Sequence, residues 1–231
     1  MLSKLGLASR TEAAQWVRAG RVSVNGRVVS DAEFPVRQGV DRLEIAGQPA
    51  VASARQVLML NKPRGLVTTA RDERGRDTVY DCLADAQLPW LAPVGRLDKA
   101  SEGLLLFSND PQWAARITDP RRGLLKTYHV QIDRLPDAAL LAHLQRGVMH
   151  EGERLAAHAA RCLRSGAKHA WLEIELTEGR NRHLRRLLGA CDIGVLRLVR
   201  VRLGTLALGK LAKGAWRRLD AAEIAALDAL P

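Results

Sequence analysis

One short apolar run, LLLF at residues 104–107, constrains the fold of this chain more than any other feature. Gly103 precedes it directly and Gly95 stands a little earlier, and a short apolar run bounded by such turn residues is typical of a buried strand. Arg96 and Asp98 lie two residues apart in the polar segment that leads into the run. The sequence therefore places a base and an acid at the mouth of a buried strand.

Length and composition indicate a globular protein. The chain has 231 residues, enough for one or two domains, and 47% of them are hydrophobic whereas 26% are charged. No apolar run approaches the ~20 residues of a membrane span, and no signal peptide is recognisable. Cys82, Cys162 and Cys191 are odd in number and far apart, which argues against a disulfide framework and a metal site. We therefore expect a cytoplasmic monomer with no membrane segment.

The net charge of +11 favours a polyanionic partner such as a nucleic acid. A general bias towards arginine in the genome is the alternative explanation. No P-loop, GxGxxG or HExxH motif is present, and the six histidines lack metal-ligand spacing. Nucleotide hydrolysis, dinucleotide redox and zinc chemistry are therefore disfavoured, so we expect no cofactor and no metal. His129 and His183 are expected to have ordinary polar roles.

The first 48 residues predict a small basic module. Ser9 and Glu12 have capping-box spacing, and Gly20 is placed to end the helix that follows. Asn25-Gly26 between alternating valines predicts a two-residue hairpin turn. We expect two short helices and a hairpin that bind RNA, with a solvated subdomain without ligand as the alternative. The basic residues around these elements are Arg10, Arg18, Arg21 and Arg27.

A small, proline-containing stretch at 47–54 predicts a linker, so we divide the chain into residues 1–48, a linker at 49–56 and a second domain at 57–231. Strand-like patterns cover 57–60, 126–132 and 171–176. Helices are expected after Asp110-Pro111 and Pro136-Asp137. Because strands and helices do not alternate regularly, the sequence favours an α+β fold over a doubly wound sheet.

The segment 178–188, EGRNRHLRRLL, predicts a helix that starts near Asn181. Its apolar residues fall on one face, opposite Arg182 and Arg186. Arg185 lies at the edge of the apolar stripe, from which it can reach a pocket beside the core. A solvated basic face is the alternative.

Four blocks, taken together, resemble the ribosomal small-subunit pseudouridine synthase A family. They are NKPRGLVTT (61–69), GRLDKASEGLLLFSND (95–110), KTYHV (126–130) and EGRNRHLRRLL (178–188). The N-terminal stretch LGLASRTEAAQWVRAGRVSVNG (5–26) resembles the RNA-binding domain named after ribosomal protein S-four. The resemblance implies a small helix–helix–hairpin domain followed by a catalytic domain with a mixed, mainly antiparallel sheet. It also implies that a uridine in ribosomal RNA is isomerised without a cofactor.

The resemblance further implies the roles of individual residues. Asp98 would be the catalytic carboxylate, Arg185 its charge partner, and Tyr128 the tyrosine that packs on the target base. Arg96 would hold a phosphate or fill the gap left by a flipped uridine, with a structural ion pair as the alternative. The remaining residues that match RNA-binding positions are Lys62, Arg64, Lys126, Arg180, Asn181, Arg182 and Arg186.

The chain departs from the family pattern at two places. Family members carry further residues before the position of Met1, so the first helix is expected to be short or the true start to lie upstream. His183 stands where the family usually has glutamine. Two other function classes remain open: a non-catalytic RNA-binding or ribosome-assembly factor, and a DNA-binding regulator, for which a helix-turn-helix is missing. The target uridine, the ribosomal subunit and the choice between direct attack on the sugar and a glycal-type route also remain open.

Overall fold

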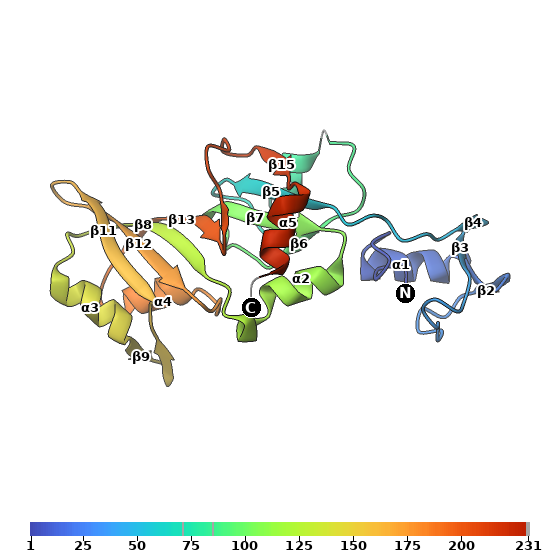
Figure 1. Ribbon diagram of the computed structural model, residues 1–231, viewed down its shortest axis with the longest axis horizontal. Coiled ribbons are helices and arrows are strands. Elements are labelled where there is room, and N and C mark those ends of the chain that lie inside the picture. The colour runs from blue at the N-terminus through green and yellow to red at the C-terminus, as the bar shows by residue number, and fades with distance from the viewer. Residues whose placement is uncertain (71, 85, 230–231) are drawn as a thin grey trace.

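The computed structural model describes residues 1–70, 72–84 and 86–229, and a small N-terminal unit lies at one end of it (Figure 1). This unit contains α1 (Arg10–Arg18) and a four-stranded sheet in the order β2-β1-β3-β4. The strands are β1 (Val22–Val24), β2 (Arg27–Val29), β3 (Leu43–Ile45) and β4 (Gln48–Pro49).

The predicted N-terminal hairpin is confirmed. Strands β1 and β2 pair antiparallel around Asn25 and Gly26, whose φ angles of 51° and 80° are those that a two-residue turn requires. The Ser9 hydroxyl accepts a hydrogen bond from the Glu12 backbone N–H at 3.0 Å and so caps α1.

The first of the two expected helices is short, as the departure from the family pattern suggested, and one further N-terminal expectation needs correction. This first helix is a single turn, in which the N–H groups of Lys4 and Leu5 bond to the Met1 carbonyl. So short a segment cannot offset the cost of helix nucleation, and Gly6 (φ 72°) ends it. The predicted linker begins too early, because β4 pairs with β3 and the Ala50 N–H bonds to the Leu43 carbonyl.

A nine-stranded sheet forms the centre of the second domain. Its order is β11-β12-β8-β13-β7-β5-β15, with β6 on β7 and β14 on β13. The pairing of β13 with β7 is parallel and the other ladders are antiparallel, as predicted for a mixed, mainly antiparallel sheet. The strands are β5 (Val57–Lys62), β6 (Ala92–Val94), β7 (Glu102–Ser108), β8 (Lys126–Ile132), β11 (Ala159–Ser165), β12 (Ala170–Leu176), β13 (Val195–Leu203), β14 (Leu206–Ala207) and β15 (Trp216–Arg218).

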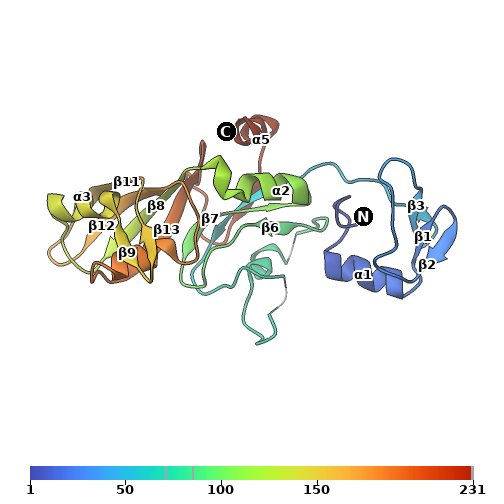
Figure 2. The same cartoon turned by 90° about the horizontal axis from the view of Figure 1, so that it is seen from below.

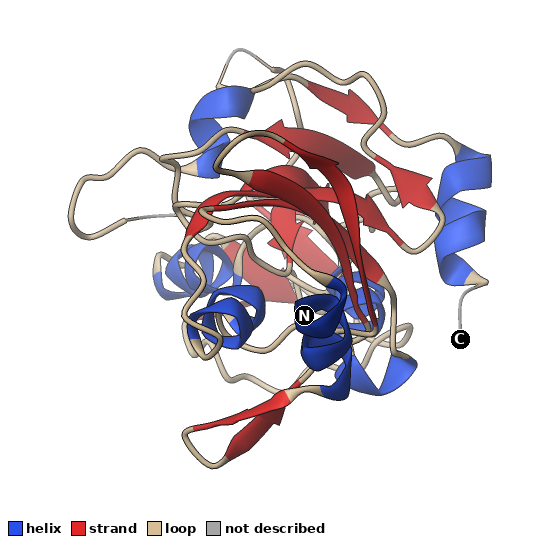
Figure 3. Ribbon diagram, turned by 90° about the vertical axis from the view of Figure 1, so that its left-hand side faces the viewer, coloured by secondary structure: helices blue, strands red, loops and turns tan. Residues whose placement is uncertain are grey.

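Helices cover both sides of this curved sheet (Figure 3). Asp110 and Asp137 cap α2 and α3 with their carboxylates, as their sequence positions predicted. The α-helices are α2 (Pro111–Thr118), α3 (Ala138–Arg146), α4 (His183–Gly189) and α5 (Ala221–Asp228), and two short 3₁₀ turns are η1 (Val79–Leu83) and η2 (Pro120–Arg122). A separate hairpin joins β9 (Val148–His150) to β10 (Glu153–Leu155).

Strand β7 is buried on both of its faces, which explains its uninterrupted apolar run. Leu105 and Phe107 pack into the core that includes residues of α3, α4 and η1, whereas Leu104 and Leu106 pack with α2 and α5. Figure 2 shows α2 and α5 together on one side of β7. Within the described part of the chain, no helix is long and apolar enough to cross a membrane.

Candidate active site

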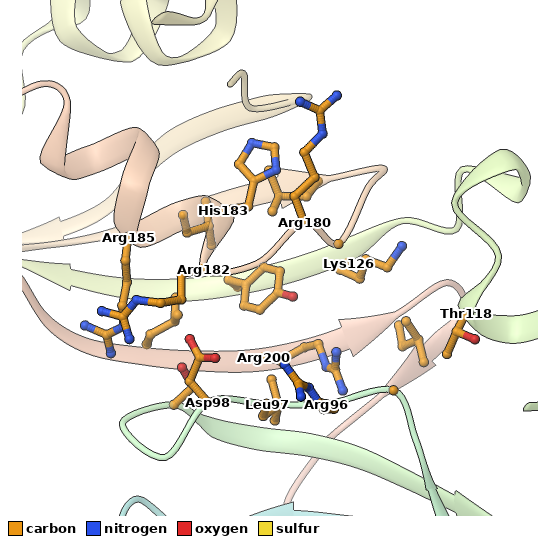
Figure 4. A pocket seen from close by; sticks show the side chains of 18 of the residues that line it. Arg96, Leu97, Asp98, Thr118, Lys126, Arg180, Arg182, His183, Arg185 and Arg200 are labelled. Carbon is orange, nitrogen blue, oxygen red and sulfur yellow. The ribbon is translucent and has the colours of Figure 1, made fainter. Parts of the chain in front are cut away.

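A cleft of about 200 Å³ lies where the loop before β7 meets β8, β13 and the start of α4 (Figure 4). It brings together Asp98, Tyr128 and Arg185, which come from three separate segments. Among the described residues that line it, Asp98 is the single carboxylate. Six cations share this lining: Arg96, Lys126, Arg180, Arg182, Arg185 and Arg200.

The loop that carries Asp98 is held by the segment after β5. The Gly65 N–H bonds to the Lys99 carbonyl at 2.8 Å. The Thr68 hydroxyl donates to the Leu97 carbonyl at 2.7 Å and accepts from the Leu97 N–H at 3.4 Å. Thr68 therefore binds both backbone groups of the residue that precedes Asp98.

Lys62 is the third residue that holds the Asp98 loop, beside Gly65 and Thr68, and we call these three contacts the clamp. The predicted role of Lys62 as a phosphate contact is wrong. Its side chain is fully buried, and Nζ donates to the carbonyls of Pro63 (3.1 Å), Asp98 (3.2 Å) and Ser101 (2.8 Å). Burial lowers the pKa of Lys62 to about 8, and the Asp98 charge opposes this shift. A side chain in this position holds the Asp98 loop and cannot reach RNA.

Arg185 lines the cleft, but the expected ion pair with Asp98 is absent from the described structure. Its Nη2 donates to the Ala100 carbonyl at 3.1 Å and its Nη1 to the Val195 carbonyl at 3.5 Å. Burial lowers the pKa of Arg185, and the charge of Arg182 acts in the same direction, whereas the charge of Asp98 raises it. Arg185 is therefore close enough to Asp98 to interact through space without direct contact.

Helix α4 begins at His183, two residues later than predicted. Arg182 precedes it in the left-handed conformation (φ 47°) and is exposed at the cleft, and Asn181 is exposed beside it. Tyr128 on β8 is 9% exposed and lies opposite Ile174 and Arg200 in the strand register. These neighbours fix the tyrosine in the cleft wall.

Two of the arginines expected to contact phosphate are bound by acids of the protein. One Glu153 oxygen lies 2.6 Å from Nη1 of Arg180, and the other lies 2.7 Å from Nη2 of Arg186. Glu178 binds Nε of Arg180 at 2.7 Å as well. Glu153 of the β9–β10 hairpin therefore pairs with Arg180 and Arg186, two arginines that were expected to bind RNA phosphates.

The remaining predicted RNA contacts are more available. Arg96 is exposed and makes no hydrogen bond or ion pair with the described residues. Lys126 donates to the Thr177 carbonyl at 3.2 Å, and burial lowers its pKa to about 8. Arg64 is exposed and reaches the Leu196 carbonyl at 3.4 Å. The N-terminal arginines Arg10, Arg18, Arg21 and Arg27 are also exposed.

Comparison with known proteins identifies the family. A model described as RNA pseudouridylate synthase matches residues 56–190, and a model of the S4 domain matches residues 1–41. The chain belongs to the RNA pseudouridylate synthase family. The enzyme is therefore an isomerase with an N-terminal S4 domain.

Relatives of this pseudouridine synthase span most of its length. An uncharacterized RNA pseudouridine synthase of Aquifex aeolicus is 37% identical over 98% of this chain and 91% of its own. The ribosomal large subunit pseudouridine synthase B of Bacillus subtilis is 34% identical over 100% and 94%, and that of Escherichia coli K12 is 36% identical over 96% and 79%. A crystal structure of a pseudouridylate synthase superposes with a TM-score of 0.68 at 28% identity, over 95% of this chain and 94% of the other. The Bacillus subtilis and Escherichia coli relatives are named ribosomal large subunit pseudouridine synthase B, so the resemblance to the small-subunit synthase A family needs correction.

The sequence reasoning missed Arg200 of the synthase. This arginine is 7% exposed, and its Nε donates to the Leu104 carbonyl at 2.8 Å. The alternation of β13 carried a signal, because Arg200 shares the inward side with Leu198. An arginine at an inward strand position is a candidate for a functional site.

His183, predicted to have an ordinary polar role, is 3% exposed in the cleft wall. Its Nδ1 lies 3.4 Å from a Glu178 oxygen, and neither ring nitrogen has a hydrogen-bond partner in the described structure. Burial lowers its pKa, which favours the neutral ring. No group of three or more His, Cys, Asp or Glu side chains suited to a metal occurs among the described residues.

Proposed function

We propose that this enzyme converts a uridine of large-subunit ribosomal RNA to pseudouridine, with Asp98 as the catalytic carboxylate and no cofactor. The substrate assignment is supported by the named relatives in Bacillus subtilis and Escherichia coli, which are ribosomal large subunit synthases. The observation that carries the catalytic assignment is Asp98 itself, which is the single carboxylate among the described residues of a cation-lined cleft.

The reaction breaks the bond between N1 of uracil and C1′ of ribose and joins C1′ to C5 of the same base. A proton leaves C5 and N1 finishes protonated, so atoms balance without a co-substrate. An ionised carboxylate suits this chemistry, because carboxylates act at the anomeric carbon of sugars in glycosidases. Asp98 serves either by direct attack on C1′ or in a glycal-type route.

The surrounding side chains have complementary roles in this proposal. Arg185 supplies a positive charge that interacts with the Asp98 carboxylate through space. Tyr128 packs against the uracil and assists proton removal at C5. Arg96 holds a phosphate or fills the space of the flipped uridine. Residues 1–48 bind RNA phosphates through Arg10, Arg18, Arg21 and Arg27, and residues from 57 onwards carry out the isomerisation.

Mapping of pseudouridine in both ribosomal RNAs, from cells with and without the enzyme, tests this proposal. We expect a modified position of the large-subunit RNA to revert to uridine in the cells that lack the enzyme. A loss confined to small-subunit RNA would contradict the substrate assignment. If both ribosomal RNAs keep all their pseudouridines, ribosomal RNA is not the substrate.

A further inference from the structure

Arg200 is a buried guanidinium that has no acidic partner among the described residues. Strand β13 places it opposite Tyr128 of β8 on one side and Gly103 of β7 on the other. Gly103 permits this close packing, since a Cβ there would lie 2.3 Å from the Arg200 carbonyl oxygen. Nε of Arg200 donates a hydrogen bond to the Leu104 carbonyl at 2.8 Å, and the two Nη atoms have no hydrogen bond or ion pair with the described residues. The free edge of the guanidinium is therefore available in the cleft.

Further cations surround the same part of the cleft. Burial is the main cause that lowers the pKa of Lys126, and the nearby charge of Arg200 lowers it further, whereas the charge of Glu178 raises it. Lys126 and Arg200 are therefore close enough to repel each other. Arg96 is exposed at the rim and unpaired among the described residues. In Figure 4, Arg96, Arg200 and Lys126 lie on one side of Asp98, whereas Arg182 and Arg185 lie on the other.

Such an arrangement is unfavourable without a ligand. A buried charge normally requires a partner of opposite charge, and like charges in a poorly solvated cleft repel each other. A bound anion would remove both costs. The planar fork of arginine binds phosphate oxygens through two parallel N–H groups, and a lysine adds a point charge.

We propose that Arg200 and Lys126, with Arg96 at the rim, bind a phosphodiester group of the RNA next to the target uridine. This inference rests on the proposed function, because it takes RNA as the ligand of the cleft. The register supplies the geometry, since Arg200 neighbours Tyr128 on the adjacent strand. A uracil packed on Tyr128 places its sugar towards Asp98 and a backbone phosphate towards Arg200.

The test measures binding by Asp98→Asn protein, so that the result does not depend on the chemical step. The probe is a short ribosomal RNA fragment that contains the mapped uridine. Matched fragments carry an uncharged methylphosphonate in place of the phosphodiester on the 5′ side or the 3′ side of that uridine. Arg200→Gln should weaken binding of the natural fragment by roughly ten- to a hundredfold, the equivalent of one charge-assisted bidentate contact.

Coupling between the two changes decides the outcome. At one of the two linkages, the methylphosphonate should weaken RNA binding by the Asp98→Asn protein as much as Arg200→Gln does. In the protein that also carries Arg200→Gln, the same methylphosphonate should cause no further loss of affinity. Lys126→Gln should couple to the same linkage, and Arg200→Lys should recover part of the affinity. Arg202→Gln is the matched control, since Arg202 lies exposed on the same strand, and its effect should be independent of both linkages.

The proposal would be overturned if, at both linkages, the affinity losses caused by the methylphosphonate and by Arg200→Gln simply added. It would also be overturned if Arg200→Gln left the RNA affinity unchanged. If Arg200→Gln does not fold, the same criterion applies to Lys126→Gln and Arg200→Lys. Failure of the proposed function looks different. In that case the fragment could still show the coupling, but the wild-type enzyme would form no pseudouridine in it.

Discussion

Replacement of Lys62 by methionine tests whether a buried lysine holds the Asp98 loop. Methionine has a similar length but neither charge nor donors, so the carbonyls of Pro63, Asp98 and Ser101 lose their shared partner. We expect the chemical step to slow because the loop loses its clamp, while RNA affinity changes little. The stability of the variant relative to the wild type should also depend on pH.

The size of this pH-dependent stability difference follows from the pKa of Lys62, which burial lowers from 10.5 to about 8. Between these values the unfolded chain binds more protons than the native protein, so wild-type stability rises with pH. Relative to Lys62→Met, the wild type should gain roughly 2 to 3 kcal/mol in unfolding free energy between pH 7 and pH 10. The same titration should slow the wild-type chemical step above about pH 8, since a neutral amine has only two protons for three carbonyls.

Denaturant unfolding of both proteins at several pH values between 7 and 10 measures this difference. Subtraction of the two curves removes other titrating groups, including Lys126. A stability difference that stays constant over this range would show that Lys62 titrates as it does in water and is not buried at its three carbonyls. A Lys62→Met protein with an unchanged single-turnover rate would show that the clamp has no part in catalysis.

Three further changes probe other parts of the site. Thr68→Ala should lower the single-turnover rate at saturating RNA by up to about a hundredfold, because the loop before Asp98 can shift, while Thr68→Ser keeps the hydroxyl and most of the rate. Arg185→Ala should lower the rate by on the order of a hundredfold, whereas Arg186→Ala, whose guanidinium Glu153 binds, should have little effect; the reverse order would contradict our assignment of the charge near Asp98. Deletion of residues 1–50 should weaken RNA binding more than the chemical step, and a folded truncated protein without any chemical step would refute that division of labour.

Local sequence patterns predicted the backbone well where local forces decide it. The run at 104–107 lies in β7, the Asn25-Gly26 turn forms its hairpin, and Asp110 and Asp137 cap their helices. The hairpin turn and the two helix caps depend on neighbours within a few residues, and the burial of β7 on both faces is already visible in its own uninterrupted apolar run. The first helix is reduced to a single turn for a similarly local reason, since its segment is too short to offset the cost of helix nucleation.

The burial and the partners of several basic side chains depend on residues far along the chain, and local sequence patterns did not predict them. Lys62 follows the predicted strand at 57–60 and precedes a proline, which suggested an exposed turn. In the structure it is the last residue of β5, and its acceptors include carbonyls 36 and 39 residues away. Arg180 is bound by Glu153, which lies 27 residues earlier on a hairpin that the sequence did not reveal. The burial of Arg200 depends on the pairing of β13 with β7 and β8. Periodicity reports which side a residue faces but not which partner it meets there.

The most direct test of the account compares wild-type enzyme with Asp98→Asn on unmodified large-subunit ribosomal RNA. The amide keeps the size and polarity of the side chain but cannot act as a carboxylate. Binding and pseudouridine formation are measured on the same samples, and mass spectrometry confirms that the asparagine has not deamidated. We expect both proteins to bind the RNA with similar affinity, the wild type to form pseudouridine at the mapped position, and Asp98→Asn to form none. Pseudouridine formation by intact Asp98→Asn at a rate close to that of the wild type would contradict the role of Asp98.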